Sequence, residues 1–183
     1  DADGQNLGNA NFGFTTTGVA ASSEMGLLFV MNSNANYNIH VFELDDAGQP
    51  GQQIGVIDNF RQLMGNQDCR NIEWVDDHPD GQLWIHSSNQ SLYQISVDTE
   101  NWDAIEVVQT MNGFGGNQAW GGVAHDGTNL WHGGYNRNEY VIFDDGVAEV
   151  RWVSYDPQEG EIDPDGETDV FVFLDATGLI GGM

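Results

Sequence analysis

A pattern of apolar runs and turns occurs three times along the chain, at a spacing of about fifty residues. Each copy reads as a strand, a tight turn, a second strand, a polar turn and a third strand, with Leu27, Leu83 and Leu130 at equivalent points. Periods of this length are typical of architectures in which one supersecondary unit is repeated along the chain. The repeat therefore constrains the fold more than any other feature of the sequence.

The three copies favour strands over helices. Their apolar runs are short, rich in Val, Ile, Phe, Tyr and Trp, and bounded by Gly, Asn, Asp and Ser. A fourth, more variable strand is predicted at the end of each copy, at 53–58, 104–110 and 149–155. Only residues 59–66 have a pattern compatible with a turn of helix. We predict an all-β fold of antiparallel four-stranded repeats, with units at 18–60, 72–112 and 121–156.

The turn and strand sequences of the second and third copies resemble β-propeller blades. DGQLW at 80–84 is followed by LYQI at 92–95, and DGTNLW at 126–131 begins the equivalent hairpin of the third copy. Four antiparallel strands in about 50 residues is the period of a blade. The resemblance is to the broad group that includes sugar-lactonase-like and quinoprotein-like propellers, over roughly residues 18–155. It implies blades without specifying a family, because these cues recur in propellers with unrelated activities.

Three units are fewer than the roughly four blades with which closed propellers begin. We predict a single all-β domain over 1–183, ending in an acidic loop and a terminal strand at 157–183. Strands at 168–174 and 11–17 could pair into an incomplete fourth unit that joins the two ends of the chain. Two other arrangements stay open: an open array that closes by association, and a piece of a larger protein. A β-sandwich is the alternative fold.

The charge balance restricts the possible partners. The chain has 29 acidic residues, four arginines and no lysine, which gives a formal net charge of −25. This charge excludes a nucleic-acid phosphate binder and opposes docking on anionic lipid. No apolar run approaches the roughly 20 residues that span a bilayer, so we predict no membrane insertion. So much negative charge repels itself unless it is screened. We therefore predict a halophilic protein, from either a saline environment or a site that is rich in divalent cations.

Two further features concern the compartment. The chain begins at Asp1 without a basic and then apolar leader, which suggests either a removed signal peptide or a fragment. Both interpretations favour an exported, extracellular product. Cys69 is the single cysteine, so it forms no internal disulfide, and a buried inert thiol is the more frequent role for such a residue.

The acidic segment at 156–169 predicts a calcium site. Its carboxylates alternate and a glycine follows the third of them, as in loops that fold six to eight oxygens around Ca²⁺. Val172 stands where such loops carry a bidentate glutamate, and the alternative interpretation is a solvated acidic turn. The predicted metal ligands are Glu161, Asp163, Asp165 and Asp169.

Tryptophan is abundant, with six residues in the chain. Trp84 and Trp131 occupy equivalent repeat positions, which core packing between neighbouring blades explains most simply. The functional alternative is stacking on sugar rings, for which Trp120 in a glycine-rich stretch is the better candidate. We predict a ligand-binding set, with carbohydrate as the ligand, of Asn117, Trp120 and Trp131.

The sequence offers no catalytic set. There is no Gly-x-Ser-x-Gly elbow, and no lysine for Schiff-base chemistry. Five histidines occur without a His-x-His or His-Glu-x-x-His spacing, although His125 and His132 flank one hairpin and could meet across it. Zinc or iron would need three such groups with an orienting second shell, which a linear sequence cannot display.

These observations favour a non-enzymatic extracellular binding or structural β-repeat module, stabilised by Ca²⁺. It would be a surface, filament or virion component whose partners are other copies or other subunits of an assembly. One alternative is a metal-dependent hydrolase of the sugar-lactone type, with carboxylates such as Glu24 or Glu73 directed to the axis of a closed ring. The other is a lectin that completes its propeller by oligomerisation.

Overall fold

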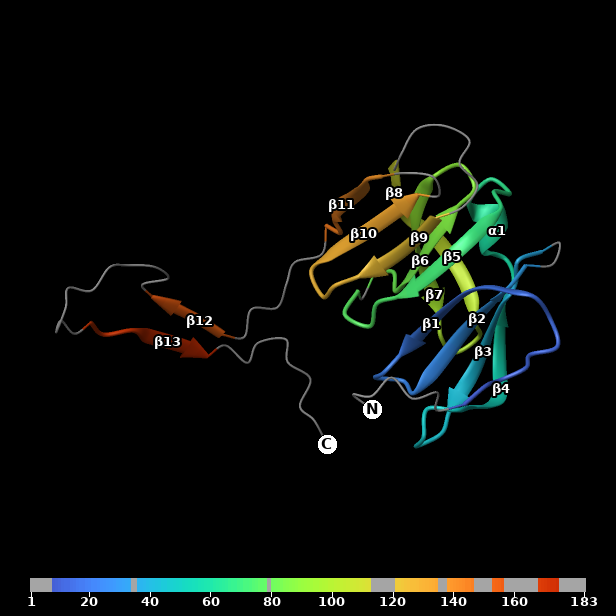
Figure 1. Ribbon diagram of the computed structural model, residues 1–183, viewed down its shortest axis with the longest axis horizontal. Coiled ribbons are helices and arrows are strands. Elements are labelled where there is room, and N and C mark those ends of the chain that lie inside the picture. The colour runs from blue at the N-terminus through green and yellow to red at the C-terminus, as the bar shows by residue number, and fades with distance from the viewer. Residues whose placement is uncertain are drawn as a thin grey trace. The chain divides into compact units, whose positions relative to one another are not determined.

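A computed structural model describes residues 8–33, 36–78, 80–112, 121–134, 138–146, 153–156 and 168–174. The chain divides into two compact units, residues 1–145 and 146–183, which are described separately. Almost all the labelled elements are antiparallel strands, which confirms the predicted all-β, propeller-like repeat (Figure 1). The single helix among the described residues, α1 (Phe60–Leu63), lies within the stretch where the sequence permitted one. No helix among them is both long and apolar enough to span a bilayer.

The described residues of the first unit form three sheets, and in each of them every strand pairs with the next strand along the chain. The first sheet has the order β1 (Thr16–Ser22), β2 (Leu27–Asn32), β3 (Ile39–Leu44) and β4 (Pro50–Ile57). The second has the order β5 (Cys69–Trp74), β6 (Leu83–Ser87), β7 (Ser91–Asp98) and β8 (Asp103–Asn112). The third contains β9 (Gly121–His125), β10 (Asn129–Gly134) and β11 (Tyr140–Asp144).

The fourth strand predicted for the third repeat lies elsewhere. β12 (Val153–Asp156) pairs with β13 (Phe171–Leu174) in a two-stranded sheet of the second unit, and not with β11. The suggested pairing of 168–174 with 11–17 is also wrong, because β13 pairs with β12 in a two-stranded sheet and, among the described strands, β1 pairs with β2 alone. Strands that are close in sequence pair at a lower loop-closure cost than strands at opposite ends of a chain.

An apolar core joins the first and second sheets. Alternate residues along each strand face this core, because successive side chains of a strand point to opposite faces of the sheet. Phe29 of β2 stacks on Trp74 of β5, with ring centroids 4.2 Å apart. Trp102 packs edge-on against Phe29 and lies over Gly55, where a Cβ would come within 2.1 Å of the indole. Glycine at position 55 is therefore needed for the indole to enter the core.

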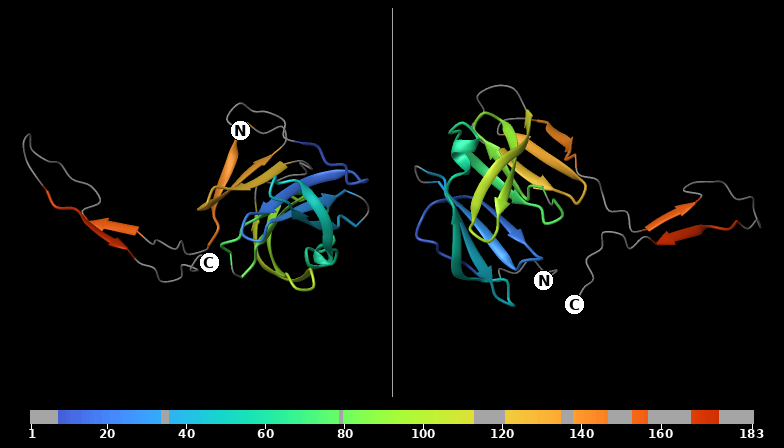
Figure 2. Two further views of the ribbon diagram at one scale, coloured as in Figure 1. Left: turned by 90° about the horizontal axis from the view of Figure 1, so that it is seen from below. Right: turned by 180° about the vertical axis from the view of Figure 1, so that it is seen from behind.

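The contact between the second and third sheets has a different composition. All five residues of β6 are buried, because this strand lies between the first sheet and the third (Figure 2). The buried apolar set is small: Val75, Trp84, Leu92, Val123 and Leu130. Beside it lie buried polar side chains: His78, His86, Gln94, His132 and Asp145. The second interface therefore depends on hydrogen bonds to a degree that the first does not.

Candidate functional site

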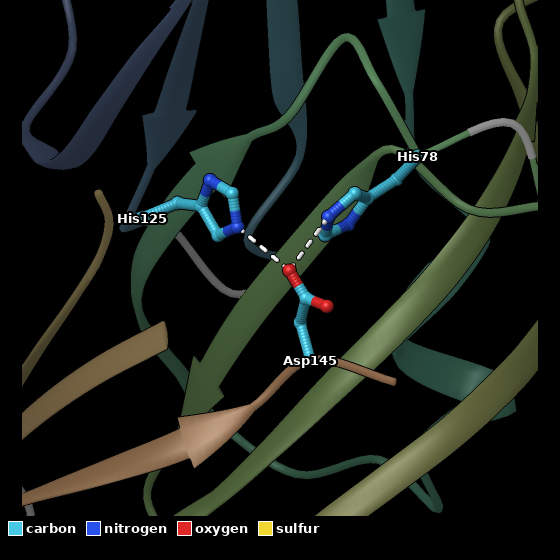
Figure 3. Close-up of side chains that lie close together, drawn as sticks. All are labelled: His78, His125 and Asp145. Atoms are coloured by element: carbon cyan, nitrogen blue, oxygen red, sulfur yellow. Dashed lines mark hydrogen bonds and ion pairs between the residues drawn. The ribbon is translucent and has the colours of Figure 1, made fainter. Parts of the chain in front are cut away.

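Three side chains that are distant in sequence meet between the second and third sheets (Figure 3). His78 comes from the turn between β5 and β6, His125 ends β9, and Asp145 follows β11. The Oδ2 atom of Asp145 lies 3.0 Å from Nε2 of His78 and 2.7 Å from Nε2 of His125. Only 2%, 9% and 4% of the side chains of His78, His125 and Asp145 are exposed. We call this group the His–Asp–His clamp.

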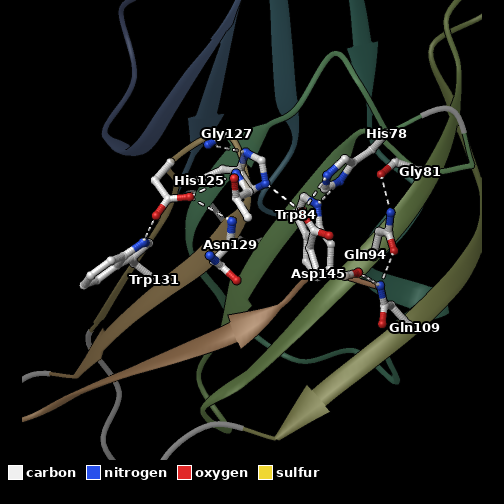
Figure 4. Close-up of polar contacts among 12 residues, drawn as sticks. His78, Gly81, Trp84, Gln94, Gln109, His125, Gly127, Asn129, Trp131 and Asp145 are labelled. Atoms are coloured by element: carbon white, nitrogen blue, oxygen red, sulfur yellow. Dashed lines mark hydrogen bonds and ion pairs between the residues drawn. The ribbon is translucent and has the colours of Figure 1, made fainter. Parts of the chain in front are cut away.

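The outer ring nitrogens of the clamp fix both tautomers. Trp84 Nε1 donates to Nδ1 of His78 at 2.9 Å, and the backbone N–H of Gly127 donates to Nδ1 of His125 at 3.2 Å (Figure 4). An indole or backbone N–H can only donate, so each Nδ1 is an unprotonated acceptor. In a neutral ring the proton then lies on Nε2, and both Nε2–H groups donate to Asp145. All four ring nitrogens thus have partners.

Glutamine side chains extend the network across the second sheet. Gln109 of β8 donates to the backbone carbonyl of Asp145 and to Oε1 of Gln94, both at 2.6 Å. Gln94 of β7 in turn donates to the carbonyl of Gly81 at 2.8 Å. The end of β11 is therefore held to the second sheet through its backbone as well as its carboxylate.

The electrostatics of the site favour a neutral His78 ring. Burial lowers the pKa of His78, while the Asp145 carboxylate opposes this shift and His125 adds to it. Glu73, half-buried on β5, has its pKa raised by burial, and His125 acts against this rise. A histidine with a lowered pKa is uncharged near neutral pH, as the tautomer derived above for His78 requires.

The donor set resembles a zinc site in composition, but its hydrogen-bond pattern does not fit one. The three possible ligand atoms lie within 4.8 Å of one another, and two histidines with a carboxylate are known zinc ligands. Asp145 lies at hydrogen-bonding distance from both rings. A metal-bound histidine also donates from its other nitrogen, while here both Nδ1 atoms accept. The group is a hydrogen-bonded clamp.

The expected meeting of His125 and His132 does not occur. In the β9–β10 register His125 pairs with Leu130, and His132 pairs with Val123, which separates the two rings along the hairpin. His132 instead contacts His86 of β6, with ring centroids 4.8 Å apart.

The ring of His86 is enclosed between the sheets. Both its ring nitrogens are buried and lack a hydrogen-bond partner among the described residues, and burial lowers its pKa to about 4. A Cβ at Gly121 would lie 2.4 Å from the carbonyl oxygen of Gly133 and 2.9 Å from His86. Glycine at position 121 therefore permits the close approach of β9 to the second sheet.

The opposite face of the third sheet carries an exposed aromatic pair. Trp131 and Tyr140 have ring centroids 5.1 Å apart and are 37% and 63% exposed. Trp131 Nε1 donates to Asp126 at 2.5 Å, and the same carboxylate accepts backbone N–H groups of Thr128 and Asn129. The Asn129 amide, the Trp131 indole and the Thr128 amide lower the pKa of Asp126. An ionised carboxylate therefore holds the indole in place.

The two equivalent tryptophans thus have different environments. Trp84 is fully buried within the sheet stack, as core packing predicted, whereas Trp131 lies on the outer face of the third sheet. Trp120 and Asn117 lie outside the described residues. Of the predicted calcium ligands, Glu161, Asp163 and Asp165 also lie outside them, and Asp169 is exposed shortly before β13.

Cys69 is buried in the first core as a free thiol. Burial raises its pKa to about 12, so it is a neutral thiol. The clamp itself was not found by sequence reasoning. Its residues have no spacing motif, and the only hint was that His125 adjoins the Asp-Gly turn of a repeat.

Comparisons with known proteins leave the family open. No protein-family model matches the chain, and no curated protein matches it significantly. Among solved structures, the chain is similar to the periplasmic gluconolactonase PpgL of Pseudomonas aeruginosa, with a TM-score of 0.46 and 16% sequence identity. The match covers 70% of this chain and 39% of that chain, so this chain spans well under half of the gluconolactonase. The antiparallel sheets fit a propeller-like fold, and no specific family is identified.

Proposed function

We propose that the chain is a non-enzymatic β-repeat module that binds carbohydrate through Trp131 and Tyr140. The observation that carries the proposal is this exposed aromatic pair on the outer face of the third sheet. The face of an aromatic ring carries partial negative charge, which complements the C–H groups on the flat side of a sugar ring. The two rings contact each other, and both are partly exposed to solvent.

The neighbouring turn supports this assignment. Asp126 holds the Trp131 indole, so little side-chain freedom is lost when a ligand stacks on it. Its carboxylate also accepts hydrogen bonds, and sugar hydroxyls donate them. Because the chain has a net charge of −25, neutral glycans are favoured over anionic ones.

The non-enzymatic role is supported by the state of the clamp. A general base or a catalytic metal needs access to the reacting atoms. In the clamp, the ring nitrogens are engaged with protein groups and the side chains are almost completely buried. This arrangement favours a structural role, joining the second and third sheets.

Export, a saline environment and calcium binding at Glu161–Asp169 remain part of the proposal. The strong negative charge supports the saline environment and the calcium binding, because salt or bound cations would screen its self-repulsion. Association with further copies or with other subunits is also proposed, with Ile142 among the exposed apolar residues available for contact.

Affinity electrophoresis through gels that contain neutral polysaccharides tests the carbohydrate proposal. Soluble starch, mixed-linkage β-glucan and galactomannan are suitable matrices. At least one matrix should retard the wild-type chain, and Trp131→Ala should lose most of this retardation. Phe171→Ala is the matched control, because Phe171 is an exposed aromatic residue of the second unit. Absence of retardation in every matrix, or equal retardation of wild type and Trp131→Ala, would contradict the proposal.

A further inference from the structure

The outer face of the first sheet contains a pocket at the opposite end of the sheet stack from Trp131. Its volume is about 400 Å³, within the range of roughly 300–1,000 Å³ that is typical of small-molecule sites. The segment before β1 forms one side, with Phe12 and Phe14, and the strands β3 and β4 form the other, with Phe42 and Gln53. We call this the Phe pocket.

The aromatic side of the Phe pocket is arranged by ring contacts. The ring centroid of Phe12 lies 5.0 Å from that of Phe42 and 5.9 Å from that of Phe14. Phe14 stacks on His40 at 4.5 Å with an interplanar angle of 24°. The three phenylalanines are half-buried, so their rings are packed in place and still partly accessible. The pocket thus offers fixed aromatic surface.

The polar side of the pocket consists of amides. Asn11, Gln49 and Gln53 are among its lining residues, and no lining residue carries a charge, although the chain contains 29 acidic residues. Local hydrogen bonds orient two of these amides. Asn11 Oδ1 accepts the N–H of Gly13 at 2.9 Å, and Gln53 Oε1 lies 3.0 Å from His40 Nδ1. An amide both donates and accepts, as a hydroxyl group does, so amides match hydroxyl groups without requiring an ion.

From this combination we infer that the Phe pocket is a second ligand site, which binds an uncharged, hydroxyl-bearing ring of the size of one or two sugar units. The inference rests on the proposed function for its ligand class, but its residues are independent of Trp131 and Tyr140. Two sites at opposite ends of one unit make the module bivalent. A bivalent module gains avidity on a polymer that can reach both sites.

Saturation-transfer NMR on the complete chain tests this inference without depending on the outcome for Trp131. The probes are methyl α-glucoside, methyl α-mannoside, methyl β-galactoside and maltose, together with tetramethylammonium. The last probe tests for a cation held over the phenylalanine rings. Trp131→Ala removes the first site, so the saturation transfer that this variant retains reports on the Phe pocket.

We expect Trp131→Ala to retain binding of at least one sugar, and Trp131→Ala/Phe14→Leu to bind it roughly tenfold more weakly, because leucine keeps the apolar packing but offers no aromatic face. Gln49→Ala in the Trp131→Ala background should also weaken binding, and it leaves the ring cluster intact.

Equal sugar binding by Trp131→Ala and by both double variants would overturn the assignment of the Phe pocket as a ligand site. Saturation of tetramethylammonium alone would overturn the ligand class. Sugar binding that is unaffected by Trp131→Ala and lost with Phe14→Leu would support the pocket while contradicting the role of Trp131.

Discussion

The two interfaces between neighbouring sheets of the first unit have opposite chemistry. The first and second sheets meet through a large apolar core that includes Phe29, Ile72 and Trp74. The second and third sheets meet through five buried apolar side chains and the His–Asp–His clamp. Both interfaces join sheets that come from consecutive copies of the same sequence repeat. The repeat therefore determines the sheets, but not the chemistry by which neighbouring sheets pack.

This difference separates stability from positioning. Apolar contact is non-directional, so the first interface supplies stabilisation in proportion to the buried area. Hydrogen bonds have strict geometry and a smaller net stabilisation, but a buried donor without a partner is costly. The clamp therefore defines how the third sheet packs on the second, because any other packing would leave buried N–H groups without an acceptor.

The largest expected effect is at the apolar interface. Phe29→Ala should lower the free energy of unfolding by about 3–5 kcal/mol, because it leaves a cavity beside Trp74 and Trp102. Urea denaturation followed by tryptophan fluorescence would measure this loss. Val19→Ala is the control, because Val19 is 56% exposed on the adjacent strand and should change stability little. Equal effects of the two substitutions would show that this core is not the main source of stability.

A smaller loss is expected at the clamp. Asp145→Ala removes the acceptor of two buried ring N–H groups and should cost about 1–3 kcal/mol in the same assay. Asp145→Asn is the matched variant, since its amide oxygen can still accept a hydrogen bond, and it should lose less. An equal loss of stability for Asp145→Asn and Asp145→Ala would mean that the negative charge, and not the acceptor, is what the two histidines need.

The next prediction concerns the pH dependence of stability, which should arise at the polar interface between the second and third sheets. The pKa of His86 is about 4 in the folded chain, against about 6.5 when unfolded, so the unfolded chain takes up the proton first as pH falls. The free energy of unfolding therefore keeps its full value above pH 6.5 and decreases as pH falls towards 4. Protonation of His86 in the unfolded chain accounts for a decrease of about 1 kcal/mol between pH 7 and 5.5. His86→Leu should remove this part of the loss. The test is the difference in unfolding free energy between wild type and His86→Leu at each pH, and parallel curves would contradict the assignment.

The smallest expected effect is a difference in salt response. Added salt should raise the melting temperature, because it screens the repulsion within a chain of net charge −25. Asp145 is almost fully buried, so wild type and Asp145→Asn should show the same increase between low and high salt. A distinctly different slope for Asp145→Asn, measured by differential scanning calorimetry, would mean that solvent ions reach the clamp.

The sequence predicted the sheets better than the site. Short apolar runs with glycine turns were sufficient to place β1 to β11, because strand pairing here is local and follows chain order. The pairing of β12 with β13 was missed, since β13 is exposed along its whole length and has no burial pattern that selects its neighbour. The clamp was missed because His78, His125 and Asp145 are brought together only by the packing of two sheets. Trp84 and Trp131 differ only because a sheet covers one and not the other.

The tautomers of His78 and His125 test the central claim, that the cluster is a hydrogen-bonded clamp, most directly. Long-range ¹H–¹⁵N correlation NMR near neutral pH, with one equivalent of zinc added afterwards, distinguishes the two protonation sites on each ring. We predict that both rings are protonated at Nε2, as the donors Trp84 and Gly127 require, and that their signals do not change with zinc. Protonation at Nδ1 together with a zinc-dependent shift of both rings would contradict the clamp and identify a metal centre.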